Sequence, residues 1–357
     1  MDKFITVGEA AKRLDVSAET LRRWDNNGKF TSVRHPFNNY RVYTEDQLSS
    51  LAEDLQLEIK YLKSSEVVAL SNPCVITDFG KLFQMDALKF LQTLDSGSVD
   101  LIFADPPYNI GKANWDLFPS QKEYLDWCME WIKESHRTLK KTGSLYVCGF
   151  SEILADLKWV TNGIFHSSKW LVWFYRNKAN LGNDWGRSHE SILHLRKSKD
   201  FLFNVDEVRI PYNEHTLKYP ERAQAESSQY ANGKKNKQIW SPNPLGAKPK
   251  DVFEVPTIAN GSWERYPHLT QKPVELLRKI VLSSSNPGDL IIDPFGGSGT
   301  TFAVAEAYGR NWLGTELEDV HCQIIKNRLT DSAHLQRIRT EKDTKESNNR
   351  RSKLRGK

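Results

Sequence analysis

Short apolar runs alternate with longer amphipathic segments through most of this 357-residue chain. Runs with the length and composition of buried strands lie at residues 83–86, 99–104, 143–149, 170–175, 191–195, 290–292 and 312–316. Segments that repeat apolar residues at helical spacing lie at 87–94, 123–139, 273–281 and 302–308. This alternation predicts an α/β domain of Rossmann type, with a mixed, mostly parallel sheet covered by helices on both faces.

A separate pattern occupies about the first 60 residues. Two short segments of helical periodicity, 6–14 and 17–28, are joined by a tight turn, which is typical of a helix-turn-helix. Thr6 is placed to cap the first helix, and Gly28 is placed to close the second. Short strands around the turn at Asn38-Asn39 follow and predict a wing.

These first 60 residues resemble the MerR-like winged helix family. The resemblance implies DNA contact through basic and aromatic side chains of the second helix and the wing. The side chains concerned are Arg22, Arg23, Arg34, Arg41 and Tyr43. A winged helix that is kept for protein contacts alone is the alternative.

We place the winged domain at residues 1–62, a linker at 63–77 and the second domain at 78–332. Residues 205–266 interrupt the second domain with a polar stretch that holds six prolines and several aromatic residues. Its basic cluster, Lys234, Lys235 and Lys237, favours a nucleic-acid-contacting insertion, and a flexible surface loop is the alternative. Residues 333–357 hold nine Lys or Arg against three acids, which predicts a disordered basic arm suited to phosphate contact or to solubility.

Composition narrows the class of protein further. No segment approaches the roughly 18 consecutive apolar residues of a membrane helix, and the first residues do not have the pattern of a signal peptide. The four cysteines are scattered without a CxxC pair, which argues against a disulfide framework and against a zinc site. We therefore expect a cytoplasmic protein without a metal site, and the DNA contact that the resemblance implies would associate it with the nucleoid.

The strand at 99–104 ends abruptly on Asp105-Pro106-Pro107-Tyr108. Because the prolines cannot extend a strand ladder, this turn lies at the carboxyl end of a buried strand, where open α/β sheets bind ligands. Asp105 and a backbone carbonyl are suited to accept N–H bonds from a flat polar molecule, and Tyr108 is suited to stack on it. This predicts a pocket for an amino-bearing nucleobase, with a plain proline-rich turn as the alternative.

The strand at 290–292 ends on a glycine-rich turn, Asp293-Pro294-Phe295-Gly296-Gly297-Ser298-Gly299-Thr300. Glycines let a ligand approach backbone N–H groups at the start of the next helix. The dinucleotide fingerprint is absent because no glycine follows three residues after Gly299, which argues against a nicotinamide oxidoreductase. Glu316 ends the following strand and is placed to hold a ribose diol.

Together the two strand ends resemble the S-adenosylmethionine-dependent DNA amino-methyltransferases over about residues 80–330. The DPPYNIGKANWD segment precedes GDLIIDPFGGSGTT. This is the circularly permuted order of the family's β group, whose recognition region lies between the two motifs. In the permuted sheet the two motif strands are neighbours.

The resemblance also implies roles for individual residues. Catalysis falls to the turn Asp105, Pro106, Pro107 and Tyr108. The cofactor is contacted by Asp86 at its adenine, by Glu316 at its ribose, and by Lys272, with His268 and Gln271 nearby, at its methionine carboxylate. The remaining cofactor contacts are Asp293, Phe295, Gly296, Gly297, Ser298, Gly299 and Thr300.

We therefore expect methyl transfer from S-adenosylmethionine to the N6 amine of adenine in double-stranded DNA. Methylation of cytosine N4 is the first alternative, and a MerR-like regulator with a ligand-binding methyltransferase-like domain is a more remote one. Cytosine-C5 chemistry needs a nucleophilic thiolate, and the only Pro-Cys pair, Pro73-Cys74, lies in the expected linker. A cognate restriction endonuclease is a possible partner, and the sequence leaves the oligomeric state open.

Overall fold

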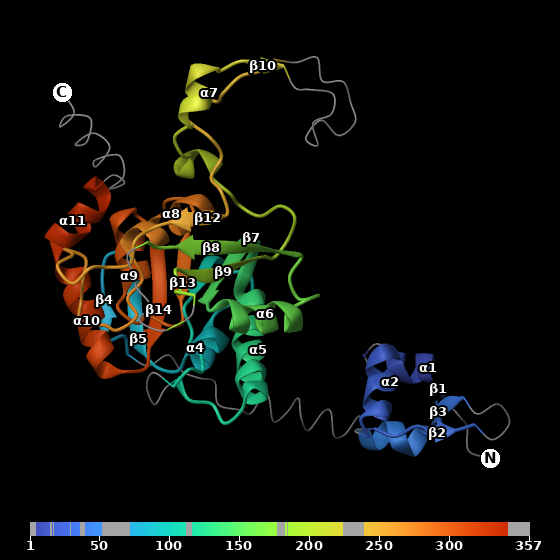
Figure 1. Ribbon diagram of the computed structural model, residues 1–357. Helices are drawn as coiled ribbons and strands as arrows, with labels where there is room; N and C mark the ends of the chain where they lie inside the picture. The colour runs from blue at the N-terminus through green and yellow to red at the C-terminus, as the bar shows by residue number, and fades with distance from the viewer. Residues whose placement is uncertain are drawn as a thin grey trace, which may run out of the picture. The chain divides into compact units, whose positions relative to one another are not determined.

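A computed structural model describes residues 5–14, 16, 18–28, 30–35, 40–51, 72–111, 116–176, 183, 185–223 and 239–341. The chain divides into two compact units, Met1–Ala69 and Leu70–Lys357. Figure 1 shows the elements of both units, which are described separately below.

The first unit is a small helical domain with a three-stranded sheet. Its elements are β1 (Ile5–Thr6), α1 (Val7–Arg13), α2 (Ala18–Asn26), β2 (Val33–Arg34) and β3 (Arg41–Tyr43), and the antiparallel strand order is β1-β3-β2. The Thr6 hydroxyl accepts a hydrogen bond from the Glu9 amide at 3.3 Å, so it caps α1 as predicted. The predicted turn at residues 38–39 lies outside the described residues.

Two of the residues expected to contact DNA in this unit are engaged elsewhere. Tyr43 is fully buried and its ring stacks on Phe30 with 4.9 Å between centroids, so its predicted DNA contact is wrong. Arg41 forms an ion pair with Asp25 and donates to Asn26 at 2.8 Å, which holds the wing strand against α2. Three other predicted contacts, Arg22, Arg23 and Arg34, are exposed.

The second unit is built on a nine-stranded sheet with the order β12-β8-β9-β7-β6-β13-β14-β5-β4. The strands are β4 (Val75–Ile76), β5 (Gly80–Gln84), β6 (Val99–Ala104), β7 (Leu139–Gly149), β8 (Ser167–Phe174), β9 (His189–Arg196), β12 (Val252–Glu254), β13 (Leu290–Asp293) and β14 (Asn311–Glu316). Five neighbouring pairs are parallel, whereas β9 is antiparallel to β7 and β8, and β4 is antiparallel to β5. The prediction of a mixed, mostly parallel sheet is confirmed.

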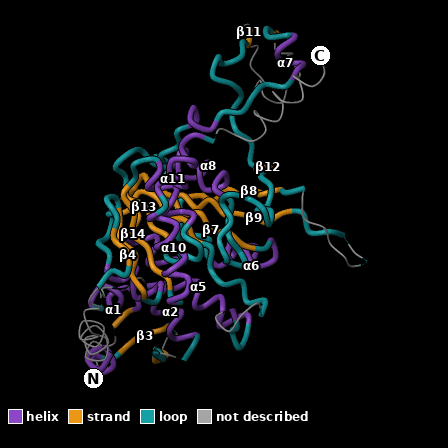
Figure 2. The backbone as a smooth tube through the Cα atoms, turned by 90° about the vertical axis from the view of Figure 1, so that its left-hand side faces the viewer, coloured by secondary structure: helices purple, strands orange, loops and turns teal. Residues whose placement is uncertain are grey.

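Helices cover both faces of this sheet, as Figure 2 shows. One layer contains α4 (Ala87–Thr93), α5 (Gln121–Thr138) and α6 (Ser151–Val160), and the other contains α8 (Val274–Ser284), α9 (Thr300–Ala307), α10 (Asp319–Thr330) and α11 (Ser332–Thr340). Successive residues of β6 point to opposite faces. Accordingly, Leu101 and Phe103 pack in one core and Ile102 and Ala104 in the other.

Two expected domain boundaries are wrong. The linker was expected to reach residue 77, but β4 pairs with β5 and Val75 is buried, so the sheet begins earlier. A disordered arm was expected from residue 333, but α11 packs on the domain because its Ile338 is buried and Arg339 donates to the Ala307 carbonyl. Residues 342–357 lie outside the described residues.

Part of the insertion at 205–266 extends from the body of the second unit as an arm (Figures 1 and 2), whereas its later residues Val255 and Trp263 pack in the core. It contains η2 (Val205–Val208), α7 (Glu214–Lys218), β10 (Arg222–Ala223) and β11 (Ile239–Trp240), and it returns to the sheet edge through β12. The basic cluster Lys234, Lys235 and Lys237 lies outside the described residues.

Candidate active site at the carboxyl ends of the central strands

Neighbouring parallel strands bring the predicted acids to one edge of the sheet. Strand β13 pairs with β6 on one side and with β14 on the other, and β14 pairs with β5. The carboxyl ends of these strands carry Asp105, Asp293, Glu316 and Asp86. The Asp-Pro-Pro-Tyr strand and the glycine-turn strand are therefore neighbours, as predicted.

A buried carboxylate that sequence reasoning missed holds the turn after β6. Asp116 is 1% exposed. One of its oxygens accepts the backbone amides of Tyr108 and Asn109 at 2.6 and 2.7 Å, and the other accepts the Ile110 amide at 3.2 Å. Asn109 has a φ of 55°, which is uncommon for a residue other than glycine. The side chain of Asp116 thus fixes the backbone that carries Tyr108.

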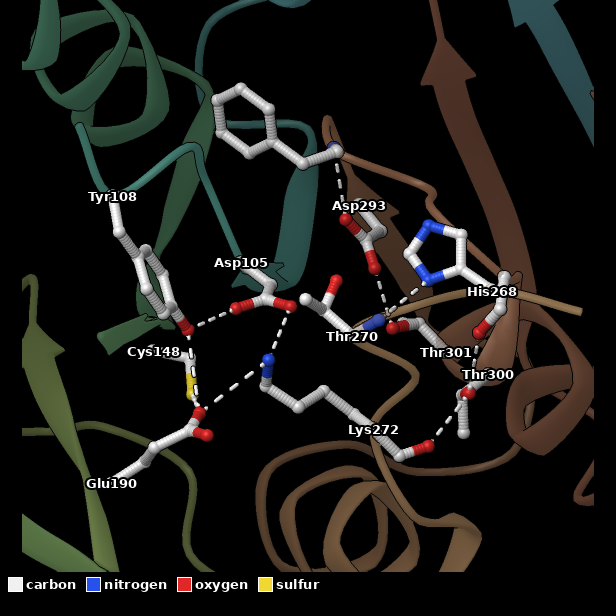
Figure 3. Close-up of polar contacts among 12 residues, drawn as sticks. Asp105, Tyr108, Cys148, Glu190, His268, Thr270, Lys272, Asp293, Thr300 and Thr301 are labelled. Atoms are coloured by element: carbon white, nitrogen blue, oxygen red, sulfur yellow. Dashed lines mark hydrogen bonds and ion pairs between the residues drawn. The ribbon is translucent and has the colours of Figure 1, made fainter. Parts of the chain in front are cut away.

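Both oxygens of Asp105 have partners within the protein (Figure 3). The Tyr108 hydroxyl donates to Oδ1 at 2.5 Å, and the Lys272 ammonium donates to Oδ2 at 2.6 Å. Lys272 also lies 3.6 Å from Glu190 of β9. Burial alone would lower the pKa of Lys272, but the negative charges of Asp105 and Glu190 outweigh it and raise that pKa. Lys272 is therefore charged at neutral pH.

The positions of Lys272 and Tyr108 differ from the sequence-based expectation. Lys272 was expected at a methionine carboxylate, but its ammonium lies between two carboxylates of the protein, which stabilise it in the interior. Tyr108 was expected to offer an open ring face. Tyr108 is 8% exposed, its ring packs edge-on against Phe150 with 5.0 Å between centroids, and its hydroxyl is turned toward Asp105.

The glycine turn after β13 wraps around the end of β14. The Gly296 amide donates to the Thr315 carbonyl at 2.9 Å, and the Gly297 amide donates to the Glu316 carboxylate at 2.7 Å. Gly297 and Gly299 have φ angles of 52° and 74°, a backbone region that favours glycine. The turn therefore holds the Glu316 carboxylate against its own backbone at the edge of the site.

Asp293 supports the turn from the interior. Its carboxyl group accepts the Phe295 amide at 3.0 Å and the Thr301 hydroxyl at 2.5 Å. Burial raises the pKa of Asp293 to about 8, despite these hydrogen bonds. The predicted contact residue Asp293 thus lies beneath the cradle and shapes it.

A buried arginine that no sequence motif marked ties the cradle to α10. Arg328 donates to the Ser298 carbonyl at 3.1 Å and to the Thr300 hydroxyl at 2.9 Å. The Thr300 hydroxyl in turn donates to the backbone carbonyl of Lys272 at 2.9 Å. Lys272 therefore contacts Asp105 with its side chain and the cradle with its main chain.

Two histidines flank the Glu316 end of the site. Burial would raise the pKa of Glu316, but hydrogen bonds from His321 and from backbone amides lower it, so Glu316 is ionised at neutral pH. His268 packs on His321 with 4.5 Å between ring centroids, and burial lowers the pKa of His268 to about 4. A neutral His268 ring thus forms one wall beside Gly297, where an added Cβ would come within 3.4 Å of it.

The last two predicted cofactor residues have structural partners. Gln271 accepts the Tyr266 amide at 2.8 Å and donates to the Glu264 carbonyl at 2.5 Å, so it shapes the loop before α8. Asp86 accepts the Lys89 amide at 3.0 Å and caps α4. Gln84 at the end of β5 pairs with Glu316 at the end of β14. Asp86 comes two residues after Gln84, so it follows the strand that neighbours the strand of Glu316.

An Asp-Pro-Pro-Tyr turn beside a glycine cradle, on neighbouring parallel strands, defines the class of amino-methyltransferases. The chain belongs to the DNA methylase family, whose model matches residues 99–327. This membership confirms the predicted activity of a DNA methyltransferase that takes its methyl group from S-adenosylmethionine. A model described as MerR family regulatory protein matches residues 6–43.

Curated relatives support this assignment. Type II methyltransferase M1.MboII of Moraxella bovis is 36% identical over 249 residues, which cover 67% of this chain and 92% of the relative. DNA adenine methyltransferase YhdJ of Escherichia coli (strain K12) is 35% identical over 271 residues, 73% of this chain and 87% of the relative. The solved PvuII DNA methyltransferase (cytosine-N4-specific) shares the fold, with a TM-score of 0.56 and 18% identity over 76% of this chain and 96% of its own.

Two further properties bear on the expectations from sequence. Among the helices that the structure describes, none is long and apolar enough to cross a membrane. Within the same described ranges, no group of three or more His, Cys, Asp or Glu residues is arranged to hold a metal ion.

Proposed function

We propose that this protein methylates the N6 amine of adenine in duplex DNA at a short recognition sequence. The observation that carries the proposal is the position of Asp105 directly beside the glycine cradle, on paired strands β6 and β13. The name of the relative in Escherichia coli, a DNA adenine methyltransferase, supports the choice of base.

The chemistry of the amine explains why a carboxylate is needed there. The lone pair of an exocyclic amine is delocalised into the ring, so the nitrogen is a poor nucleophile. Asp105 and the Pro106 carbonyl would each accept one N–H bond and direct the lone pair out of the ring plane. Positioning and electrostatic stabilisation of this kind supply most of the acceleration without a covalent intermediate.

The residues around the cradle fit S-adenosylmethionine, which supplies a methyl group activated on a sulfonium sulfur. Glu316 would accept the two ribose hydroxyls, and Asp86 on the adjacent strand would accept from the adenine amine. Gly297 has no side chain beside the His268 ring, where a Cβ would lie 3.4 Å from that ring, and this favours close approach of a ligand to the backbone of the turn. His268, Gln271 and Lys272 belong to the loop that closes this side of the cradle.

The base must leave the duplex to reach Asp105. Tyr108 would supply the stacking surface once its hydroxyl releases Asp105, and this offsets part of the cost of unstacking. Because the Tyr108 amide is fixed by Asp116, only the side chain needs to turn.

The same two acceptors accommodate the N4 amine of cytosine, so cytosine-N4 methylation remains the second candidate. The fold shared with a cytosine-N4-specific enzyme favours keeping it. Membership in the DNA methylase family and the intact Asp105 and Tyr108 argue against a regulator that only binds a ligand.

The order of the motifs supports a circularly permuted, β-group arrangement, with residues 205–266 as the segment that reads the DNA sequence. The first unit would be a MerR-like winged helix that adds DNA affinity through the exposed Arg22, Arg23 and Arg34. We place the enzyme in the cytoplasm at the nucleoid, with a restriction endonuclease as its possible partner.

Methylation of whole-genome-amplified bacterial DNA tests the proposal, because this DNA contains every short sequence and carries no methyl groups. Purified protein is incubated with tritiated S-adenosylmethionine, and the nucleosides are then separated. We expect label in N6-methyl-2′-deoxyadenosine, its loss in Asp105→Ala, and its retention in Asp126→Asn, a control on the exposed face of α5. Label in N4-methylcytosine would select the second candidate, and transfer that survives Asp105→Ala would refute the mechanism.

A further inference from the structure

Glu190 is a carboxylate in the active site that belongs to neither motif. It lies near the amino end of β9, and its side chain is 13% exposed. Because β9 is antiparallel to β7, the beginning of β9 reaches the edge where the parallel strands end. Figure 3 shows Glu190 facing Lys272, Tyr108 and Cys148.

One oxygen of Glu190 contacts the partners of Asp105. It lies 3.6 Å from the Lys272 ammonium, accepts from the Tyr108 hydroxyl at 3.5 Å, and accepts from the Cys148 thiol at 3.8 Å. Burial raises the pKa values of both Tyr108 and Cys148 well above their usual range, so these two groups are neutral. Lys272 is therefore shared between two carboxylates, and the charges of both raise the pKa of Lys272.

This charge balance matters because Lys272 and a substrate amine compete for Asp105. With Asp105 as its only counterion, the buried ammonium would neutralise that carboxylate and weaken it as an acceptor. Glu190 divides the attraction of Lys272 between two carboxylates. It also offers the Tyr108 hydroxyl a second acceptor, so Oδ1 of Asp105 is released at lower cost when Tyr108 turns.

We propose that Glu190 is a positioning residue for methyl transfer: it holds Lys272 and Tyr108 so that Asp105 stays available to the amine of the target base. The inference rests on the proposed function and deepens it, since it assigns a second carboxylate to the same site. Glu190 acts through Lys272 and Tyr108, and contact with the base is left to Asp105.

The test compares full-length variants in single-turnover and steady-state methylation of the amplified DNA. In Glu190→Gln we expect the rate of transfer to fall about tenfold or more, with the KM values for DNA and S-adenosylmethionine little changed, because binding contacts remain. Glu190→Asp keeps the charge and should recover much of the rate. Glu134→Gln, which alters an ion-paired carboxylate of α5 outside the site, should behave as wild type.

The double variant Glu190→Gln with Lys272→Met gives a second, independent outcome. It removes the competing ammonium as well as Glu190 and leaves Asp105 free of the ion pair, so it should transfer faster than Glu190→Gln alone. Glu190→Gln leaves Lys272 paired with Asp105 at 2.6 Å, so the buried ammonium keeps a counterion and we expect the single variant to fold. The double variant should retain measurable transfer.

Three results would overturn the inference: a wild-type rate in Glu190→Gln, an equal loss in Glu190→Asp, or a double variant without transfer. Absence of transfer by the wild-type protein would instead refute the proposed function, and the inference with it.

Discussion

Replacing Asp116 tests whether the active turn is held by one buried carboxylate. Asp116→Asn keeps the size of the side chain and one acceptor oxygen, which can still serve the Tyr108 and Asn109 amides. The other oxygen becomes an amide nitrogen that faces the Ile110 N–H group, where it cannot accept. The variant therefore loses the hydrogen bond from Ile110, and the acceptor of the two remaining hydrogen bonds becomes uncharged.

The structure gives the size of the effect. A hydrogen bond to a charged group contributes roughly 1.5–3 kcal/mol, and an orphaned buried donor costs a similar amount. We therefore expect Asp116→Asn to lower the free energy of unfolding by about 2–3 kcal/mol, which a domain of this size survives. The left-handed conformation of Asn109, at φ 55°, is uncommon for a residue other than glycine and is held by these hydrogen bonds. Without the carboxylate it can relax and move Tyr108.

Two measurements check this reasoning. Urea unfolding gives the loss of stability. Methylation without denaturant, at a temperature where the variant is folded, gives the loss of activity. We expect methyl transfer to fall further than the folded fraction does, while Asp126→Asn changes neither. If the folded variant methylates DNA at the wild-type rate, the turn does not depend on Asp116.

The remaining predictions concern the cradle and the first unit. Gly297→Ala places a Cβ at a left-handed position 3.4 Å from His268, so we expect weaker binding of S-adenosylmethionine by calorimetry and a loss of about 1 kcal/mol in stability; unchanged affinity would contradict the assignment of the cradle. The pKa of Asp293 is raised from 3.8 to about 8, so the folded state binds the extra proton and the wild-type free energy of unfolding should fall as pH rises between these values. The free energy of unfolding of Asp293→Asn, measured by denaturation at several pH values, should not show this decline. If the wild type and the variant decline in parallel, the pH dependence does not come from Asp293. Deleting residues 1–69 should leave methylation at saturating DNA largely intact, because the proposed catalytic and cofactor-binding residues all lie in the second unit; loss of all activity would show that the first unit is needed for chemistry.

The strand ends at the site follow from local sequence, whereas the pairing of the two motif strands was implied by the resemblance to the DNA amino-methyltransferases. An apolar run that stops at Asp105-Pro106 or at a glycine turn marks the carboxyl end of a strand, because proline and glycine end the ladder. Each signal is contained within about ten residues, and the structure confirms both predicted strand ends. The two-residue strand β4 has no periodicity, so its pairing with β5 was not visible in the sequence.

The sequence did not predict that Tyr43 is buried in the first unit or that Arg41 pairs with Asp25. Arg41 and Tyr43 alternate with Val42 along β3, which predicts that the first and third residues share one exposed face. The domain is small, however, and its core recruits Tyr43 to stack on Phe30, while Asp25 of α2 attracts Arg41. The burial of Tyr43 therefore depends on how the helices pack on the sheet, and the alternation of residues along β3 does not contain this information.

Sequence reasoning missed Glu190 and the contact between Lys272 and Asp105, and these two misses have a different cause. Lys272 and Asp105 are 167 residues apart in the sequence, so no local pattern connects them. Glu190 lies at the start of β9, whereas the search for site residues considered the carboxyl ends of strands. Their meeting depends on β9 running antiparallel beside β7, so that a strand beginning lies among strand ends. Because Lys272 also accepts the Thr300 hydroxyl with its main chain, a shift of the cradle moves the ammonium that Asp105 and Glu190 share. The two motifs are therefore connected by residues outside both, and variants at those residues should affect catalysis without altering either motif.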